Sequence, residues 1–317
     1  GELIAGAVEN VVKSQVRQAT RTLDVVETNA RLWRRGLDPS AGFGAMVTPA
    51  PRTRFNRSIG IKRSYAVGEL AVVDVKTAGK KLGATLNDVF LAICGGGIRR
   101  YLQREGELPE ASLIAGCPVS LRMPGDASMS NQVTMMQVSL GSSESNAARR
   151  VVQIKESSTT AKGVTADLAG SVDCDPVAWG LPIAMQEMAV RAEQTRAADR
   201  AETPFNVVVS NVPGPRKTLY SNGARMVTHY PVSIPTHGMG VNITMQSYDG
   251  TLFFGITGCA EALPDASVLR DDIVAEFVAL TEDLAEPGLT QSATVGSDIP
   301  VPRVAISLEE PIAIAAA

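Results

Sequence analysis

The two histidines carry the side chains that exchange protons most readily near neutral pH. His229 stands in the stretch RMVTHY and His237 in the stretch THGMG. A catalytic base needs a nucleophile and an orienting group at compatible positions, and neither histidine has a carboxylate or nucleophile at a spacing that indicates such a pair. The pattern therefore favours structural or substrate-lining roles for both. It also predicts that this chain alone does not complete a histidine-dependent active site.

Metal, phosphate-loop and nucleic-acid chemistry are each disfavoured by spacing or composition. Asp173 and Asp175 flank a cysteine, but two acids before a proline also make an ordinary helix entry, and no further ligand cluster accompanies them. We expect no metal site. Residues 95–97 are three glycines without GxxxxGK(S/T) or GxGxxG spacing, which favours close packing of a helix on a sheet. A net charge of −3, 4% aromatic residues and no basic block argue against a nucleic-acid partner.

Two short segments place polar side chains at fixed backbone positions. Asn87 and Asp88 follow Thr85 where a helical pattern begins, and the sequence TLND resembles a capping box. An asparagine there can cap backbone amides or hold a neighbouring loop, and both interpretations stay open. The hexapeptide SNVPGP, residues 210–215, ends an apolar run. Its two prolines fix φ around a permissive glycine, so the turn is rigid and Asn211 can be aimed.

The elements that must position these segments begin with an amphipathic pattern over residues 12–33. Its apolar residues recur in steps of four and three, which predicts a helix. The polar face mixes acidic and basic side chains, whereas a membrane-surface helix would be richer in lysine and arginine, so packing on protein is favoured over lipid. Residues 36–56 are rich in proline and glycine and indicate a linker.

Alternating strand-like and helical patterns follow this linker. We expect strands at 58–64, 112–121, 132–140, 205–210, 225–233, 241–247 and 251–257, and helices at 69–82, 85–104, 145–163, 176–200 and 265–284. Asp249-Gly250 is a strong hairpin signal between the last two strands. Helices between separated strands, followed by an antiparallel run, predict a mixed-sheet α/β layer domain. Residues 285–317, rich in proline, serine, threonine and small residues, predict an irregular tail.

Several motifs occur in an order that resembles the C-terminal half of the bacterial wax ester synthase/diacylglycerol acyltransferase family. They are TLNDVFLAICGGGIRRYL, PVSLR, SNVPGP and YPVS, and the likeness runs over about residues 57–284. The resemblance implies a chloramphenicol-acetyltransferase-like fold in which this mixed-sheet domain is the second of two, preceded by a crossover at residues 1–56. It also implies an HHxxxDG motif whose second histidine deprotonates the acceptor hydroxyl. The chain contains no HH pair, so that motif is expected on a domain before Gly1.

The resemblance also implies roles for particular residues. Asn87 and Asp88 match a pair that braces the catalytic loop and does not act as the base. Arg122, which ends PVSLR, could pair with a phosphate of CoA, although a surface or interdomain ion pair is an equal alternative. For Pro213 and Gly214 an architectural role is the favoured alternative. The substrate-facing residues implied by the motifs are Ser210, Asn211, Pro213, Gly214, His237, Gly238, Met239 and Gly240.

The expected function is therefore half of an O-acyltransferase that moves a fatty acyl group from acyl-CoA to a diacylglycerol or long-chain alcohol, without a further cofactor. Expected partners are the HHxxxDG domain, the two substrates, and a peripheral contact with the inner membrane or lipid inclusions. The absence of a signal-like start and of long apolar runs predicts a cytoplasmic location. The alternative is a non-catalytic module that binds acyl chains or coats lipid inclusions. A condensation-type domain is disfavoured because it too needs HHxxxDG.

Overall fold

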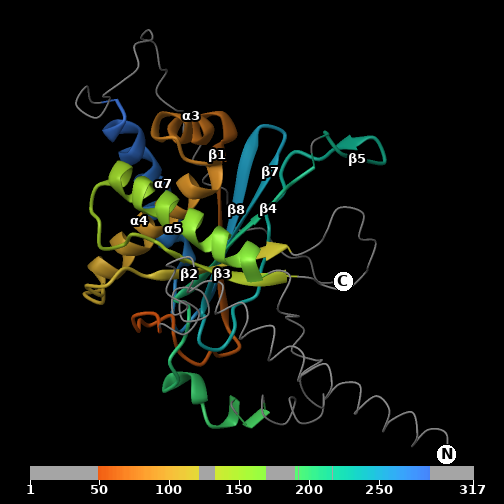
Figure 1. Ribbon diagram of the computed structural model, residues 1–317. Helices are drawn as coiled ribbons and strands as arrows, with labels where there is room; N and C mark the ends of the chain where they lie inside the picture. Colours follow the sequence, from red (N-terminus) through yellow and green to blue (C-terminus); the bar gives the residue numbers. More distant parts are fainter. Residues whose placement is uncertain (1–48, 121–132, 169–189, 192, 216, 286–317) are drawn as a thin grey trace, which may run out of the picture.

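A mixed six-stranded sheet with helices on one face organises the described part of the chain (Figure 1). The computed structural model describes residues 49–120, 133–168, 190–191, 193–215 and 217–285. The sheet strands are β1 (Arg63–Ala71), β2 (Ile114–Ser120), β3 (Val133–Ser139), β4 (Val207–Val212), β7 (Val241–Tyr248) and β8 (Thr251–Cys259). The predicted mixed-sheet α/β fold class is confirmed.

The strand order β1-β8-β7-β4-β2-β3 combines two antiparallel ends with a parallel centre. β1, β8 and β7 pair antiparallel, β4 lies parallel to both β7 and β2, and β3 closes the other edge antiparallel to β2. The predicted hairpin is present between β7 and β8, where Tyr248 pairs with Thr251. Asp249 and Gly250 both have positive φ, of 47° and 86°, as a two-residue hairpin turn requires.

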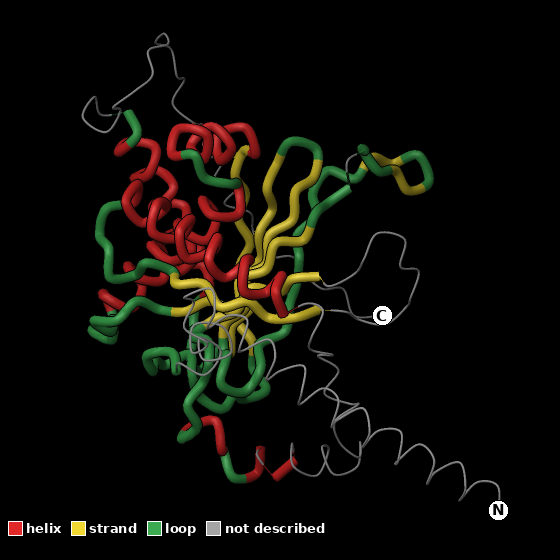
Figure 2. The backbone as a smooth tube through the Cα atoms, in the orientation of Figure 1, coloured by secondary structure: helices red, strands yellow, loops and turns green. Residues whose placement is uncertain are grey.

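The helices pack together on one side of this sheet (Figure 2). They are α3 (Val72–Leu82), α4 (Leu86–Arg104), α5 (Ala147–Leu168) and α7 (Ala266–Asp283). A short 3₁₀ turn, η2 (Ala197–Asp199), precedes β4 and lies apart from them. Phe90 of α4 meets Phe254 of β8 edge to face, with ring centroids 5.9 Å apart. Both side chains are fully buried, so α4 is the central helix that seals this face of the sheet.

The three glycines of α4 allow close approach, as predicted, although chiefly toward other helices. A Cβ at Gly97 would lie 2.9 Å from the backbone of Ile273 in α7, and one at Gly96 would overlap Glu276 of α7 and Arg150 of α5. A Cβ at Gly95 would overlap the carbonyl oxygen of Leu140, just after β3. The glycine run therefore serves helix packing, and the partner is mainly α7 where a sheet was expected.

The first strand and the linker differ from the sequence-based expectation. A strand was predicted at 58–64 and a helix from 69, but β1 extends from Arg63 to Ala71 because all nine residues pair with β8. Residues 49–56 were assigned to a linker, yet Phe55 and Asn56 are completely buried. This end of the predicted linker is therefore anchored in the fold.

The strand predicted at 225–233 is wrong apart from its first residue. Only Ala224–Arg225 (β6) is extended and paired, with Tyr220–Ser221 (β5). The following residues, 226–236, form a strap over the face of the sheet opposite the helices. Tyr230 packs edge to face on Phe253 at 5.3 Å, and the Tyr65 hydroxyl donates to the Pro231 carbonyl oxygen at 3.2 Å. The strap cannot join the sheet beside β7 or β8, because both edges of these strands are already paired.

Other predicted elements agree with the structure within a few residues or lie outside the described residues. The strands at β2, β3, β4, β7 and β8 and the helices at α4, α5 and α7 are confirmed. The amphipathic helix at 12–33, most of the helix at 176–200, Asp173 and Asp175, and the tail beyond residue 285 lie outside the described residues.

Candidate functional site

Asn87 and Asp88 have different surroundings at the start of α4. The Asp88 carboxylate accepts hydrogen bonds from the Thr85 amide at 2.9 Å, the Thr85 hydroxyl at 2.7 Å and the Ser158 hydroxyl at 2.6 Å. The Asp88 amide donates to the Thr85 hydroxyl at 3.2 Å, which completes the predicted capping box. The Asn87 side chain is half-buried and makes no hydrogen bond within the described residues. Asp88 is therefore structural, whereas the Asn87 amide remains available to a further group.

Because the Asp88 carboxylate accepts from both the amide and the hydroxyl of Thr85, we expect Asp88→Asn to be measurably less stable. We expect the free energy of unfolding to fall by about 1–3 kcal/mol at neutral pH, since a buried carboxylate that accepts three hydrogen bonds is replaced by a neutral amide with a single acceptor oxygen. Burial raises the pKa of Asp88, but hydrogen bonds from Ser158 and Thr85 outweigh it and leave this pKa below its ordinary value. The folded carboxylate thus binds its proton less tightly than the unfolded one. Its contribution is complete above about pH 4 and is lost as the pH falls through the folded pKa.

Urea unfolding at pH 7, 5 and 3 measures this effect. The matched control is Asp74→Asn in the first turn of α3, where the carboxylate has no hydrogen bond among those described. The control should lose about 0.5 kcal/mol through the helix dipole alone. An Asp88→Asn deficit no larger than that of the control, or one that stays constant from pH 7 to pH 3, would contradict the assignment.

The SNVPGP segment forms a corner at the carboxyl end of β4. A Cβ at Gly214 would overlap the Ser247 carbonyl oxygen of β7, so only glycine fits this approach. Asn211 and Pro213 are exposed, and the side chains of Ser210 and Asn211 make no hydrogen bond within the described part of the chain. Glycine is therefore required at position 214 for steric reasons. The side chains of Ser210 and Asn211 present polar atoms that have no partner among the described residues.

The THGMG segment, residues 236–240, forms a tight turn against residues 55–59. Gly238 has a φ of 81° and its amide donates to the Arg57 carbonyl oxygen at 2.9 Å, while the Gly240 amide donates to the Phe55 carbonyl oxygen at 2.8 Å. The exposed His237 ring accepts a hydrogen bond at Nδ1 from the Ile59 amide at 3.2 Å. Gly238 thus has a conformational reason to be glycine, and one nitrogen of His237 is already occupied.

Asn56 ties this turn to the rest of the sheet, and sequence reasoning missed it. Its buried side-chain amide donates to the carbonyl oxygens of Phe205 at 2.8 Å and Gly238 at 2.9 Å, and to the Thr203 hydroxyl at 2.9 Å. Its carbonyl oxygen accepts from Thr53 and, at 2.9 Å, from the Asn206 side chain. The signal in the sequence was an asparagine beside an aromatic residue inside the predicted linker, but the groups to which its side-chain amide donates lie 147 to 182 residues away.

The predicted substrate-facing motifs do not meet in one place within this chain. β4 and β7 are parallel and in register, with Val212 beside Gln246. SNVPGP contains the last residues of β4 and the turn after it, whereas THGMG precedes the start of β7. The two motifs therefore lie at opposite ends of the sheet, about six residues or roughly 20 Å apart along the strands.

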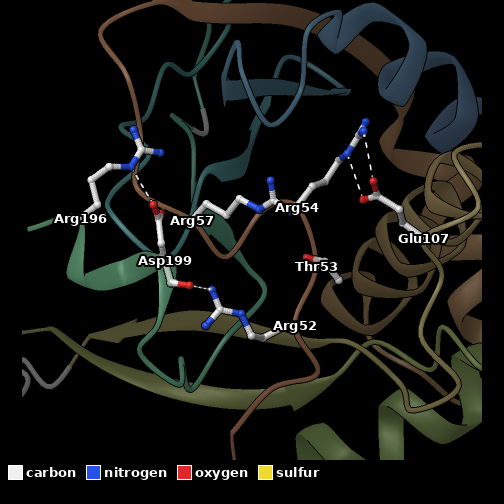
Figure 3. A pocket seen from close by; sticks show the side chains of 7 residues that line it. All are labelled: Arg52, Thr53, Arg54, Arg57, Glu107, Arg196 and Asp199. Carbon is white, nitrogen blue, oxygen red and sulfur yellow. Dashed lines mark hydrogen bonds and ion pairs between the residues drawn. The ribbon is translucent and has the colours of Figure 1, made fainter.

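A pocket of about 720 Å³ lies beside the THGMG turn and carries four arginines. Figure 3 shows its lining, which consists of Arg52, Thr53, Arg54, Arg57, Glu107, Arg196 and Asp199. A smaller adjoining cavity of about 130 Å³ shares Arg54, Arg57 and Arg196 and extends to Gly240. None of these arginines was predicted as a site residue, and two of them, Arg52 and Arg54, stand in the segment interpreted as a linker.

Ion pairs hold part of this lining in place. Arg54 binds Glu105 at 2.8 Å and Glu107 at 3.1 Å, and Arg196 binds Asp199 at 2.6 Å. The hydrogen bond from Arg196, together with the Ser58 amide, holds the pKa of Asp199 well below its usual range. Asp199 is therefore ionised at neutral pH and fixes the Arg196 guanidinium. Glu105 and Glu107 hold the Arg54 guanidinium in place.

The remaining predicted residues are distributed as follows. Arg122 lies outside the described residues. His229 lies in the strap, and its Nδ1 atom is enclosed without a hydrogen-bond partner among the residues described. Within those residues, no group of three or more histidine, cysteine, aspartate or glutamate side chains is placed to hold a metal ion. No helix in the described part of the chain is both long and apolar enough to cross a membrane.

Two family models match the sequence. The WS/DGAT C-terminal domain model covers residues 129–281, and the wax ester synthase/diacylglycerol acyltransferase catalytic domain model covers residues 3–90. The second match includes β1, α3 and the Asn87-Asp88 pair. The two matched ranges together cover the greater part of the chain.

Similar curated proteins come from Mycobacterium tuberculosis H37Rv. One, named "Putative diacyglycerol O-acyltransferase Rv3480c", is 38% identical over 217 residues, which are 68% of this chain and 43% of that protein. Another, named "Putative diacyglycerol O-acyltransferase Rv1760", is 33% identical over 292 residues, 90% of this chain and 57% of that protein. The chain thus spans about half the length of the curated relatives it matches.

A solved structure shows the same fold. The wax ester synthase/diacylglycerol acyltransferase from Marinobacter aquaeolei VT8 superposes with a TM-score of 0.57 and 25% identity, over 83% of this chain and 56% of that one. The match supports the chloramphenicol-acetyltransferase-like architecture that the sequence motifs implied.

Proposed function

Because the chain belongs to the wax ester synthase/diacylglycerol acyltransferase family, we propose that it is the C-terminal part of an O-acyltransferase acting on acyl-CoA. The acceptor is a diacylglycerol or a long-chain alcohol, and the product is a triacylglycerol or a wax ester. The observation that carries the proposal is the match to both family models on one chain with the acyltransferase-like fold. Acyl-CoA serves as substrate, and the reaction needs no further cofactor.

The reaction requires a base that takes up the proton of the acceptor hydroxyl. The acceptor hydroxyl loses its proton as its oxygen attacks the thioester carbonyl carbon, and the carbon–sulfur bond then breaks to release CoA. Nδ1 of His237 accepts from the Ile59 amide, so in the neutral ring the proton sits on Nε2 and neither nitrogen has a free lone pair. We therefore assign the base to the HHxxxDG histidine on the part of the family's proteins that this chain does not span.

Asn87 is the residue of this chain that we place next to that histidine loop. Its amide lies at the first turn of α4 without a hydrogen bond among the described residues, while Asp88 beside it is fully engaged in the helix cap. An uncommitted amide can donate to one backbone group of a neighbouring loop and accept from another. Asn87 thus acts as a positioning residue, and Ser210, Asn211, Pro213 and Gly214 form a rigid corner for the same partner domain.

An alternative is a non-catalytic module that binds acyl chains or coats a lipid inclusion. It is favoured by the exposed apolar side chains of the strap, Val227, Val232 and Ile234, each more than 70% accessible. The same residues support peripheral contact of the enzyme with a membrane or lipid inclusion, and flotation with anionic vesicles checks that contact.

An ester-forming assay with radiolabelled acyl-CoA and diacylglycerol tests the proposed function. We expect no turnover by this chain alone and turnover after mixing with an N-terminal half that carries HHxxxDG. The control is the same half with both histidines replaced by alanine, which should remain inactive. Asn87→Ala should lower kcat by about 10-fold or more without a loss of folding, as expected for a misplaced base.

Two results would contradict parts of this proposal. Substantial turnover by this chain alone would contradict the assignment of the base to another segment. Failure of the mixture to form ester, together with retained binding of a fluorescent fatty acid, would favour the non-catalytic module.

A further inference from the structure

The arginine pocket contains two guanidinium groups that no carboxylate neutralises within the described residues. Glu105 and Glu107 both bind Arg54, and Asp199 binds Arg196. Arg52 instead donates to main-chain carbonyl oxygens, those of Asp199 at 2.6 Å, Ala201 at 3.0 Å and Asn56 at 3.1 Å. The Arg57 guanidinium has no hydrogen bond or ion pair among the described residues. The positive charge on Arg52 and Arg57 is therefore available to an anion.

The pocket is also fixed in shape before any ligand arrives. Carboxylates or carbonyl oxygens hold Arg52, Arg54 and Arg196, so binding need not order these side chains again. Arg57 is the exception because its side chain has no such partner among the described residues, and in Figure 3 its guanidinium lies between those of Arg54 and Arg196. Its backbone is anchored by the Gly238 amide at 2.9 Å. Three arginines with fixed side chains and one whose side chain can reorient are suited to binding an anion.

Guanidinium groups favour phosphate among the anions that a protein meets. Their planar fork matches phosphate oxygens with two parallel hydrogen bonds, and the charge assists both of them. The pocket volume of about 720 Å³ lies within the usual range for small-molecule sites. Glu261 lines the smaller cavity only, which leaves the larger one as the more positive of the two. A phosphorylated small molecule thus suits the larger cavity.

We propose that the arginine pocket binds the phosphorylated nucleotide end of acyl-CoA, with Arg57 as its principal contact. The identity of this ligand rests on the proposed acyltransferase function, whereas its phosphate chemistry rests on the arginines. The smaller cavity leads from the pocket to Gly240 in the THGMG turn, so the thioester arm has a path toward the segment that the family resemblance assigns to substrate lining. The sequence pointed to Arg122 for a phosphate contact, and that residue lies outside the described residues. The described residues gather four other arginines.

Direct binding to the full 317-residue chain tests the pocket separately from catalysis. Isothermal titration calorimetry with CoA should give saturable binding that Arg57→Gln weakens by about 10-fold or more, in line with the loss of a charge-assisted contact. Lys62→Gln is the matched control, since it removes one positive charge from an exposed residue outside both cavities. It should change the affinity by less than about 2-fold. Arg57→Lys should fall between the two, because it keeps the charge and loses the fork.

Further titrations identify the source of the phosphate. Dephospho-CoA should bind more weakly than CoA to the wild type, and Arg57→Gln should reduce that difference. Equal losses in Arg57→Gln and Lys62→Gln would overturn the proposal, as would undetectable CoA binding. Binding to phosphatidylglycerol vesicles is measured as well. If Arg57→Gln weakens vesicle binding but not CoA binding, the proposal is overturned in favour of a lipid headgroup. Ester formation in the mixed assay with an acyl-CoA KM unaltered by Arg57→Gln would reject the pocket and leave the proposed function standing.

Discussion

Replacing Glu276 by alanine is expected to lower the free energy of unfolding by about 3–5 kcal/mol, because it leaves the buried Arg150 guanidinium without its carboxylate partner. Glu276 of α7 is 4% exposed and pairs with Arg150 of α5, whose side chain is 1% exposed. It also accepts from Arg100 of α4 at 2.7 Å, so one carboxylate joins three helices. Such a loss is a large share of the 5–15 kcal/mol that stabilises a typical domain. The midpoint of urea unfolding, at an unchanged m-value, measures it.

An exposed ion pair between α4 and α7, one turn away from Glu276, provides the control for Glu276→Ala. Asp272 of α7 pairs with Arg104 of α4 at 2.7 Å, but Arg104 is 48% exposed, so Asp272→Ala should cost about 0–1 kcal/mol. Replacing the buried pair together, as Arg150→Met with Glu276→Leu, should cost less than Glu276→Ala because no charge stays buried. Equal losses from Glu276→Ala and Asp272→Ala would show that the buried pair does not stabilise the layer.

The sequence patterns located most helices and the central strands because those signals are local. The capping box at Thr85 and Asp88 and the Asp249-Gly250 turn each depend on residues a few positions apart, and both are present in the structure. The buried charge at Glu276 could not be predicted in this way. Its partner Arg150 is 126 residues away, and only the packing of α4, α5 and α7 brings them together.

The two errors in the strands have a common physical cause. Residues 63–71 and 225–233 both carry apolar residues at strand-like spacing, but pairing is decided by which sheet edge is free. β1 takes the open edge of β8 and so extends to Ala71. No such edge exists beside the strap, which lies over the face of the sheet, with its backbone bound through Pro231 and its side chains through Tyr230 and Ser233.

The candidate site was predicted only in part. Motif resemblance selected the SNVPGP corner and the THGMG turn, and the structure gives Gly214 and Gly238 steric or conformational reasons. It could not select the arginine pocket, because Arg52 and Arg54 stand in a proline-rich segment typical of a linker and Arg196 lies about 140 residues away from them. The observation that would have distinguished the two is the burial of Asn56, whose side chain binds residues about 150 positions later.

Asn56→Ala is expected to destabilise the fold by about 3–5 kcal/mol, since buried polar groups left without partners cost about 1–3 kcal/mol each. The substitution deprives the Phe205 and Gly238 carbonyl oxygens of their side-chain donor and leaves the Asn206 amide with one fewer acceptor. Asn87→Ala is the matched control, because that side chain makes no hydrogen bond within the described residues. Urea unfolding should place the control within about 0.5 kcal/mol of the wild type.

The position of Asn56 connects this loss of stability to the proposed ligand site. It lies between Arg54 and Arg57 in the chain and binds Gly238, whose amide in turn holds the Arg57 backbone. Local loosening of this network should therefore move Arg57 before the whole domain unfolds. At a temperature where Asn56→Ala remains folded by circular dichroism, its CoA affinity should fall by about 10-fold or more. Wild-type CoA affinity in a folded Asn56→Ala chain would show that the network stabilises the sheet end without positioning the arginine pocket.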